Sequence, residues 1–463
     1  MKKLMILGGS RYAVPVIDAA HKLGLYVITC DYLPDNIAHK FSDEYCNVSI
    51  IDKEATLKEA QRLKIDGIVS FACDPGVTTA AYIAEKMKLP FQGSYESTCI
   101  LQDKGLFREF LTKHNFNVPH AKRYTDKNTP FNDIDYFTWP VIVKPVDSAG
   151  SKGVTKVNSP DDLEDAINVA VGGSHNGAFI IEDFLTFKGY HSSADPFTVD
   201  GKLKFVSYSD QLFDKEADNP YTPAYIIWTT SMDKKDQDYL TNETQRLLSL
   251  LDMKTGIYNI ETCVGSDGKP YIMEVSPRGG GCKIAELQRM AYGVDLIENE
   301  VRKAVGLPLT EIKQTECDGY WCEMVIHARP GESGVLKGIK IDSEIECVLY
   351  PGPCRSACGT YALPEENDLV CGGYVVRFKC VEWWQRVTAS REDKVLVETA
   401  SPSQARSKDG EGKNAMAHLP TALHTLSWKE CDHNGDPRLL FVDPKGLLRP
   451  GRSPGADLAE RRA

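Results

Sequence analysis

A turn-rich stretch between two apolar segments constrains the fold of this chain more than any other feature. Residues 265–270 (Gly-Ser-Asp-Gly-Lys-Pro) are flanked on both sides by alternating apolar residues, which predicts a β-hairpin. Antiparallel pairing would bring the carboxylates of Glu261 and Glu274 together on one face, with Arg278 beyond them. Two adjacent carboxylates repel unless a cation lies between them, and hard oxygen ligands suit Mg²⁺. The alternative is a solvated hairpin with two exposed acids.

A second segment combines a buried strand with a flexible loop. The apolar run 141–143 ends in Lys144, and the small residues of 147–154 follow. Backbone N–H groups in such a loop can close over phosphates because no side chain blocks their approach. The loop is not a P-loop, since the Gly-Lys-Ser/Thr ending is missing. A plain hairpin turn is the alternative, and Lys144 is expected at the strand end in an open cleft, where it would stabilise the fold little.

Two further segments complete a nucleotide site in consistent order. The apolar strand 178–181 breaks into charged residues at Glu182, and its edge could supply backbone groups to an adenine while Glu182 accepts from the amino group. Earlier in the chain, Lys104 opens a helical stretch at 105–114 and offers a second lysine.

Taken together, these ordered motifs resemble the ATP-grasp superfamily of carboxylate–amine ligases, which includes the carbamoyl-phosphate synthase large subunit, biotin carboxylase and L-amino-acid ligases. The resemblance covers about residues 1–310 and implies ATP with Mg²⁺ or Mn²⁺ as cofactors. It also implies a role for each matching residue: phosphate-binding Lys104 and Lys144; a flexible lid with Ser148, Gly150, Ser151 and Gly153; an adenine hinge of Glu182, Asp183, Phe184 and Leu185; magnesium ligands Glu261 and Glu274; and Arg278 facing the γ-phosphate and the acyl phosphate.

Two positions depart from the family pattern. Ser276 stands where the family usually has the asparagine that completes the metal site, and its hydroxyl could still ligate or hold a water. The family usually places an acidic ribose ligand shortly after the hinge, and here His191 is the nearest polar substitute. Since a lone histidine is often structural, both readings of His191 stay open.

Composition limits the classes of function. The chain has 463 residues, with 42% hydrophobic and 26% charged content, which is typical of a soluble globular protein. A net charge of −11 without a basic stripe argues against nucleic acid as a partner. The N-terminal apolar run is too short for a signal peptide, and none approaches a membrane span. The 14 cysteines are therefore expected to be reduced, in a cytoplasmic protein. A zinc site among the densest of them, at 347–371, would have spacings that are off pattern.

The fold is expected to be mixed α/β and α+β. Strands at 4–7, 26–30 and 65–70 alternate with helices at 14–23 and 78–87, which predicts a Rossmann-like layer over residues 1–95. Its Gly8-Gly9-Ser10 imitates a dinucleotide site, but the match to Gly-x-Gly-x-x-Gly is poor. We expect a two-lobed ATP-grasp domain at 96–310, a small β-rich closing domain at 311–384, and a largely disordered tail at 385–463, which contains only two aromatic residues.

The expected activity is ligation through an acyl phosphate. A carboxylate would attack the γ-phosphate of MgATP, and an amine would then displace phosphate from the product. Lys144 and Arg278 would stabilise the transferred charge, and no nucleophilic side chain is required. The alternatives are carboxyphosphate chemistry with bicarbonate, a non-catalytic nucleotide-binding protein and an NAD oxidoreductase. Small-molecule substrates are the expected partners, and a homodimer is compatible with the sequence.

Overall fold

The computed structural model describes residues 1–148, 150, 152–213 and 223–327, together with short strands after residue 334. The contacts of the chain divide it into two units, one of residues 1–211 and 230–316, the other of residues 212–229 and 317–463. Parallel and antiparallel sheets both occur with helices, which confirms the predicted α/β and α+β class. The predicted segment boundaries near residues 95, 310 and 384 stay predictions.

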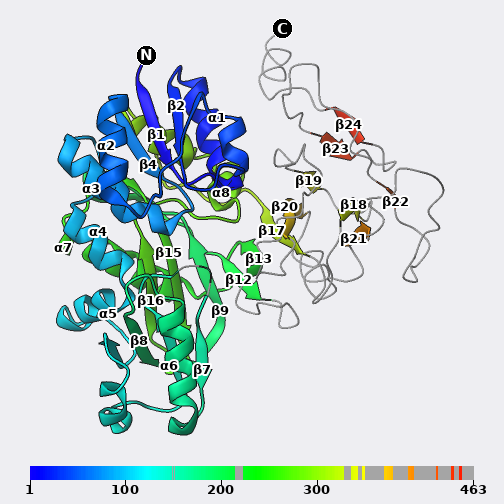
Figure 1. Ribbon diagram of the computed structural model, residues 1–463. Helices are drawn as coiled ribbons and strands as arrows, with labels where there is room; N and C mark the ends of the chain where they lie inside the picture. Colours follow the sequence, from blue (N-terminus) through cyan, green and yellow to red (C-terminus); the bar gives the residue numbers. More distant parts are fainter. Residues whose placement is uncertain are drawn as a thin grey trace. The chain divides into compact units, whose positions relative to one another are not determined.

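The first unit begins with a parallel sheet, as the alternating strand and helix patterns predict. Its strand order is β3-β2-β1-β4, and its members are β1 (Lys3–Leu7), β2 (Tyr26–Cys30), β3 (Glu44–Cys46) and β4 (Gly67–Ser70). Figure 1 shows it in blue with helices α1 (Val14–Lys22), α2 (Lys53–Leu63) and α3 (Asp74–Met87). Helix α3 begins before the predicted Thr78, because Pro75 is tolerated in the first turn of a helix.

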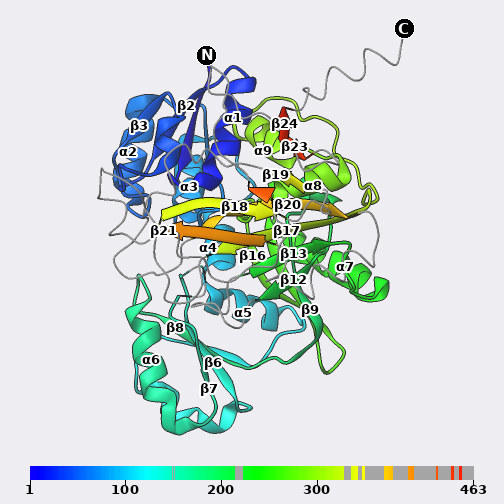
Figure 2. The same ribbon diagram turned by 90° about the vertical axis from the view of Figure 1, so that its right-hand side faces the viewer.

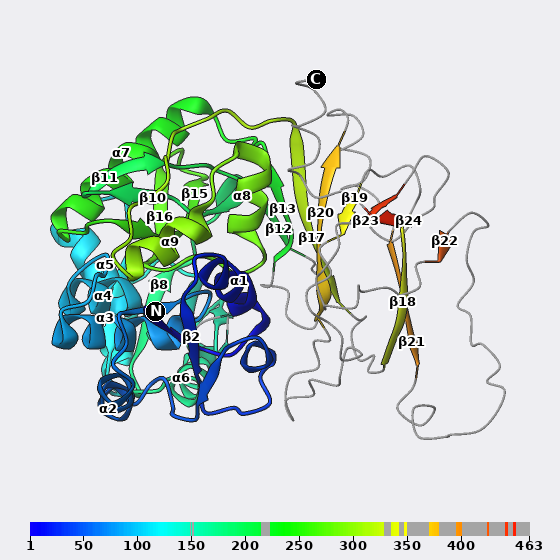
Figure 3. The same cartoon turned by 90° about the horizontal axis from the view of Figure 1, so that it is seen from above.

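Successive side chains of β1 enter different cores on the two faces of this sheet. Leu4 and Ile6 pack with α1 and α9 (Leu296–Ala304), while Met5 and Leu7 pack with α2 and α3. Helices α1 and α9 lie side by side (Figure 3). Gly67 permits the close approach of α9, because a Cβ there would lie 2.3 Å from the Ala304 carbonyl oxygen.

An antiparallel sheet with the order β5-β8-β6-β7 forms one lobe around the predicted nucleotide site (Figure 2). Its strands are β5 (Ala121–Tyr124), β6 (Val141–Pro145), β7 (Thr155–Val157) and β8 (Phe179–Asp183). Val141 and Val143 are buried in one cluster with Leu163 and Ile167 of α6 (Leu163–Gly172). The predicted strands are therefore confirmed here, and a 3-10 turn at residues 160–162 precedes α6.

The other lobe contains the predicted hairpin. Strand β15 (Asn259–Gly265) pairs antiparallel with β16 (Pro270–Ser276) on one side and β9 (Phe187–Ala194) on the other. A small sheet of β10 (Phe197–Val199), β11 (Lys202–Phe205) and β14 (Gly256–Ile257) lies in the same unit. The helices of this part are α4 (Tyr95–Gln102), α5 (Lys104–Lys113), α7 (Lys234–Leu250) and α8 (Ile284–Tyr292).

In the second unit, the residues that the structure describes form mainly β-strands. Strand β17 (Tyr320–His327) pairs antiparallel with β13 (Pro223–Trp228) and β20 (Val370–Phe378), and β20 also pairs with β19 (Cys347–Leu349). Strand β20 therefore has a partner on each side. Strand β18 (Val335–Ile341) belongs to a separate sheet of this unit, in agreement with the β-rich character expected there.

Four short strands are described in the predicted tail: β21 (Val395–Ala400), β22 (His424–Thr425), β23 (Leu440–Val442) and β24 (Leu448–Pro450). The other residues of that stretch lie outside the described ones, so the predicted disorder is untested there. The side chains of the cysteines at 347–371 also lie outside the described residues. Where the structure describes cysteine side chains, each is a free thiol, as expected. Within the same part of the chain, no helix is long and apolar enough to cross a bilayer.

Candidate active site

The hairpin brings the two predicted magnesium ligands together. Glu261 of β15 and Glu274 of β16 are direct register partners, and a bulge follows Glu261. The turn is closed by a hydrogen bond of 2.8 Å from the Gly265 N–H to the Lys269 carbonyl. Gly268 has a φ of +79°, a conformation that glycine adopts without strain. The predicted hairpin is thus confirmed.

The electrostatics of this pair favour a bound cation. Burial, and then the charge of Glu274, raise the pKa of Glu261 to about 7. The Lys104 ammonium lies 3.8 Å from a Glu274 oxygen and partly compensates the negative charge. A divalent cation between the carboxylates would remove the cost of ionising both. Among the described residues, no group of three or more His, Cys, Asp or Glu side chains is placed to hold a metal, so further ligands would have to be a hydroxyl, water or phosphate.

Lys104 connects the hairpin to the predicted lid. It is the first residue of α5, which is capped by the side chain of Asp103. Its ammonium donates to the Ser148 carbonyl at 2.9 Å as well as facing Glu274. One lysine therefore lies beside both the carboxylate pair and the loop expected to cover phosphates.

Lys144 is not in an open cleft, contrary to expectation. Its side chain is 14% exposed and pairs with Glu182, which also accepts from Arg108 at 3.0 Å. Burial lowers the pKa of Lys144 and by itself would raise that of Glu182, but the Arg108 and Lys144 charges outweigh this and hold the Glu182 pKa at about 2. Arg108 also donates to the Met273 carbonyl at 2.8 Å. Apart from its place in a predicted helix, no sequence pattern indicated a role for Arg108.

The lid residues follow directly after β6. The Ser148 hydroxyl donates to the Gly173 carbonyl. Gly150 and Gly153 have positive φ angles of +68° and +72°, and a Cβ on Gly150 would meet open space. Ser151 lies outside the described residues, so its predicted role is untested.

The hinge residues lie at the end of β8 and directly after it. The backbone N–H of Asp183 donates to the His120 carbonyl and that of Phe184 to the Pro140 carbonyl, both at 2.9 Å. The Lys156 ammonium lies 3.8 Å from the centre of the Phe184 ring, and Leu185 is partly buried. Each oxygen of Glu182 already bonds a cation, but a carboxylate has about four acceptor sites, so its adenine role stays a prediction.

His191 lies on β9, opposite Gln211, and its ring packs edge-on against Phe187 at 4.2 Å. Burial lowers its pKa to about 4, so the imidazole is neutral at pH 7. A neutral ring can both donate and accept, as a contact with ribose hydroxyls requires. Its ribose role stays a prediction.

Ser276 and Arg278 meet a carboxylate that the sequence did not reveal. Asp74, the first residue of α3, accepts from the Ser276 hydroxyl at 2.9 Å and from two nitrogens of Arg278 at 2.9 and 2.6 Å. Ser276 also accepts from Gln102 at 2.7 Å. The distance in sequence between Asp74 and Arg278 explains why no local pattern indicated this contact.

A second unpredicted carboxylate, Asp195, lies close to the same loop. It is fully buried and accepts from the Asn259 side chain at 2.9 Å and the Gly280 N–H at 2.7 Å. Burial raises its pKa to about 7. Asn259 is the register partner of Ser276, so Asp195 holds the hairpin and the loop after Arg278 together.

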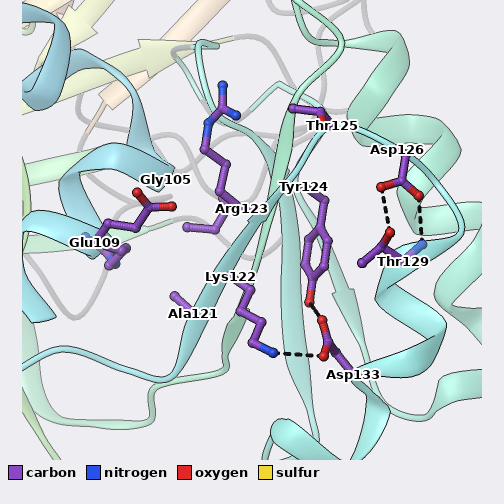
Figure 4. A pocket seen from close by; sticks show the side chains of 12 residues that line it. Gly105, Glu109, Ala121, Lys122, Arg123, Tyr124, Thr125, Asp126, Thr129 and Asp133 are labelled. Carbon is purple, nitrogen blue, oxygen red and sulfur yellow. Dashed lines mark hydrogen bonds and ion pairs between the residues drawn. The ribbon is translucent and has the colours of Figure 1, made fainter.

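A cavity of about 350 Å³ lies elsewhere in the first unit, between β5, α5 and the residues after β5. Figure 4 shows Asp133 in contact with both Lys122 and Tyr124 at this cavity. Arg108 is one of its lining residues, but none of the predicted site residues is.

Comparison with known proteins places the site in a family. A family model described as an ATP-grasp domain matches residues 101–282, which contain every predicted site residue. The chain contains an ATP-grasp domain. The predicted class of enzyme, an ATP-dependent ligase, is thereby confirmed.

Several relatives can be named. The formate-dependent phosphoribosylglycinamide formyltransferase of Prochlorococcus marinus (strain NATL2A) is 25% identical over 326 residues, which are 67% of this chain and 78% of the relative. The L-amino acid ligase of Bacillus licheniformis has a similar structure, with a TM-score of 0.67 and 17% identity over 87% of this chain and 99% of its own. The biotin carboxylase domain of the Hydrogenobacter thermophilus 2-oxoglutarate carboxylase is also similar in structure, with a TM-score of 0.65 and 16% sequence identity. The match covers 86% of this chain and 91% of that one. These two structures show the fold alone.

Proposed function

We propose that this ATP-grasp ligase phosphorylates a carboxylate with MgATP and passes the acyl group to an amine, releasing ADP and phosphate. The observation that carries the proposal is the opposed pair Glu261 and Glu274, with Lys104 beside it. Two acids and an ammonium at one end of a hairpin can hold a cation together with phosphate oxygens.

The residues fit magnesium, because burial and mutual repulsion leave Glu261 with a pKa of about 7 that a bound cation would lower. Glu261 and Glu274 would hold the ion, with the Ser276 hydroxyl as a further ligand or water contact. When bound, Mg²⁺ supplies charge neutralisation at the phosphate oxygens. The neighbour from Hydrogenobacter thermophilus was solved with MgADP, which supports the same cofactors here.

The chain's own cations would bind and orient the phosphates. Lys104 of α5 donates to the Ser148 carbonyl of the lid, and Lys144 lies on β6, the strand that leads into the lid. Because Arg108 holds Glu182 ionised, Lys144 keeps a charged partner despite its burial. Arg278 would orient the acyl phosphate, for which a planar fork is better suited than a lysine. Catalysis in this arrangement depends on proximity and charge stabilisation.

The acid is proposed to be small, with formate the first candidate. The support is the Prochlorococcus relative, which is named for formate and aligns over most of its length. Bicarbonate is the alternative, since the Hydrogenobacter thermophilus structure contains it. A cytoplasmic location and a homodimer stay predictions.

Trapping with hydroxylamine tests the function directly. An acyl phosphate reacts with hydroxylamine to give a hydroxamate, so ATP, Mg²⁺ and the correct acid should yield both hydroxamate and phosphate. A panel of formate, acetate, amino acids and bicarbonate identifies the acid, and Glu274→Gln is the negative control. Phosphate release with bicarbonate but no other acid would favour carboxyphosphate chemistry. Binding of MgADP without turnover for any acid–amine pair would favour a nucleotide-binding protein.

A further inference from the structure

Arg278 reaches the site on a long side chain, so something must fix its guanidinium. Asp74 accepts from Nε at 2.9 Å and from Nη2 at 2.6 Å, and the Gly279 carbonyl accepts from Nη1 at 3.0 Å. Arg278 is 8% exposed. Within the part of the chain that the structure describes, these bonds use three of the five N–H groups of the guanidinium, which leaves two N–H groups for another ligand.

Asp74 comes from the N-terminal parallel layer rather than from the ATP-grasp lobes. The loop before it is anchored to the loop after Arg278, because the Ala72 N–H donates to the Gly279 carbonyl at 3.0 Å. A Cβ on Gly279 would lie 2.2 Å from the Phe71 ring, so the two loops touch without space between them. The parallel layer therefore delivers Asp74 to a fixed position.

The same carboxylate also contacts the last residue of β16. Asp74 accepts from the Ser276 hydroxyl at 2.9 Å, and Ser276 in turn accepts from Gln102 at 2.7 Å. Asp74 thus holds the two polar residues on either side of Pro277.

We propose that Asp74 is a positioning residue, which holds Arg278 and Ser276 so that the remaining N–H groups of Arg278 face the transferred phosphoryl group. The proposal rests on the proposed function of Arg278. If Asp74 has this role, the N-terminal parallel layer contributes a residue to the active site. The competing role for the same geometry is a substrate mimic, in which Asp74 occupies the place of the acid's carboxylate and must be displaced.

The two roles predict opposite effects of Asp74→Asn on acid-dependent phosphate release. This substitution keeps the shape of the side chain but removes its charge and one hydrogen-bond acceptor. If Asp74 positions Arg278, the substitution should lower kcat for acid-dependent phosphate release 10- to 100-fold and leave the Kd for MgADP unchanged within about twofold. Asp74→Glu, which keeps the charge, should recover part of the loss and serves as the second variant if Asp74→Asn folds poorly. Asp161→Asn, at an exposed position away from the site, is the matched control.

A double-mutant cycle then tests whether Asp74 acts through Arg278. In an Arg278→Lys background, Asp74→Asn should cause little further loss in kcat, because the group that it positions is gone. Additive losses, an unchanged kcat, or a rise in kcat/KM for Asp74→Asn would each overturn the proposal. The wild-type protein in the same assay reports the ligase function separately, since acid-dependent phosphate release there does not depend on the role of Asp74.

Discussion

The Arg108 Nε lies 3.0 Å from a Glu182 oxygen, and both side chains are almost completely buried. The other oxygen of Glu182 holds Lys144, while Arg108 reaches on to the Met273 carbonyl, next to Glu274. A single arginine of α5 therefore links β8, whose Glu182 pairs with the proposed phosphate-binding Lys144, to β16, which carries the proposed metal ligand Glu274. The two lobes of the ATP site share this buried connection.

Replacing Arg108 by lysine should destabilise the first unit. Lysine keeps the charge but cannot bond Glu182 and the Met273 carbonyl together, so we expect a loss of about 1–3 kcal/mol in the free energy of unfolding. Urea unfolding measures it. Arg62→Lys is the matched control, because Arg62 is exposed and pairs only at the surface, where ion pairs contribute little. Equal losses of unfolding free energy in the two variants would show that the buried Arg108 contacts stabilise the protein no more than a surface ion pair does.

Lys144→Met should weaken nucleotide binding and also lower stability. It removes a charge-assisted contact to phosphate, which predicts roughly ten- to a hundredfold weaker MgATP binding by isothermal titration. It also leaves Glu182 buried with Arg108 as its remaining cation, so the melting temperature should fall.

A second variant separates the two effects of Lys144. In Lys144→Met with Glu182→Gln, Arg108 is left buried without an ionised partner, so stability should fall further than in Lys144→Met, while the affinity for MgATP stays low. Wild-type affinity in either variant would contradict the nucleotide role of Lys144.

Glu274→Gln tests the metal site. The substitution keeps the shape and removes one carboxylate, so ATP turnover at saturating Mg²⁺ should fall at least about a hundredfold. Glu164→Gln, at an exposed position on α6, is the control and should retain full turnover. Undiminished turnover in Glu274→Gln would retire the metal assignment.

The sequence predicted those parts of the site that a local pattern encodes. The Glu261–Glu274 register follows from alternation around one turn, and the parallel layer follows from strands that alternate with helices. Asp74, Arg108 and Asp195 were missed, because each acts on a residue far away in the chain and no local sequence pattern indicates such a contact. Lys144 was placed at the right strand end but in the wrong environment, because burial by a distant arginine–glutamate pair leaves no trace in its own segment.

Asp195 provides a prediction about pH. Burial raises its pKa to about 7 from an ordinary value near 3.8, so the folded protein binds this proton more tightly than the unfolded chain. The stability that protonated Asp195 contributes is fully present below about pH 4 and is lost as the pH rises through 7.

Asp195→Asn has no such proton and can still accept from the Gly280 N–H through its amide oxygen. Between pH 5 and pH 8, the unfolding free energy of the wild type should therefore fall by about 2–3 kcal/mol relative to this variant. Urea unfolding of both proteins at the two pH values measures the difference, and the comparison cancels groups such as Glu261 that titrate in both. A difference that does not change with pH would show that the Gly280 and Asn259 donors suffice to keep the buried carboxylate ionised throughout.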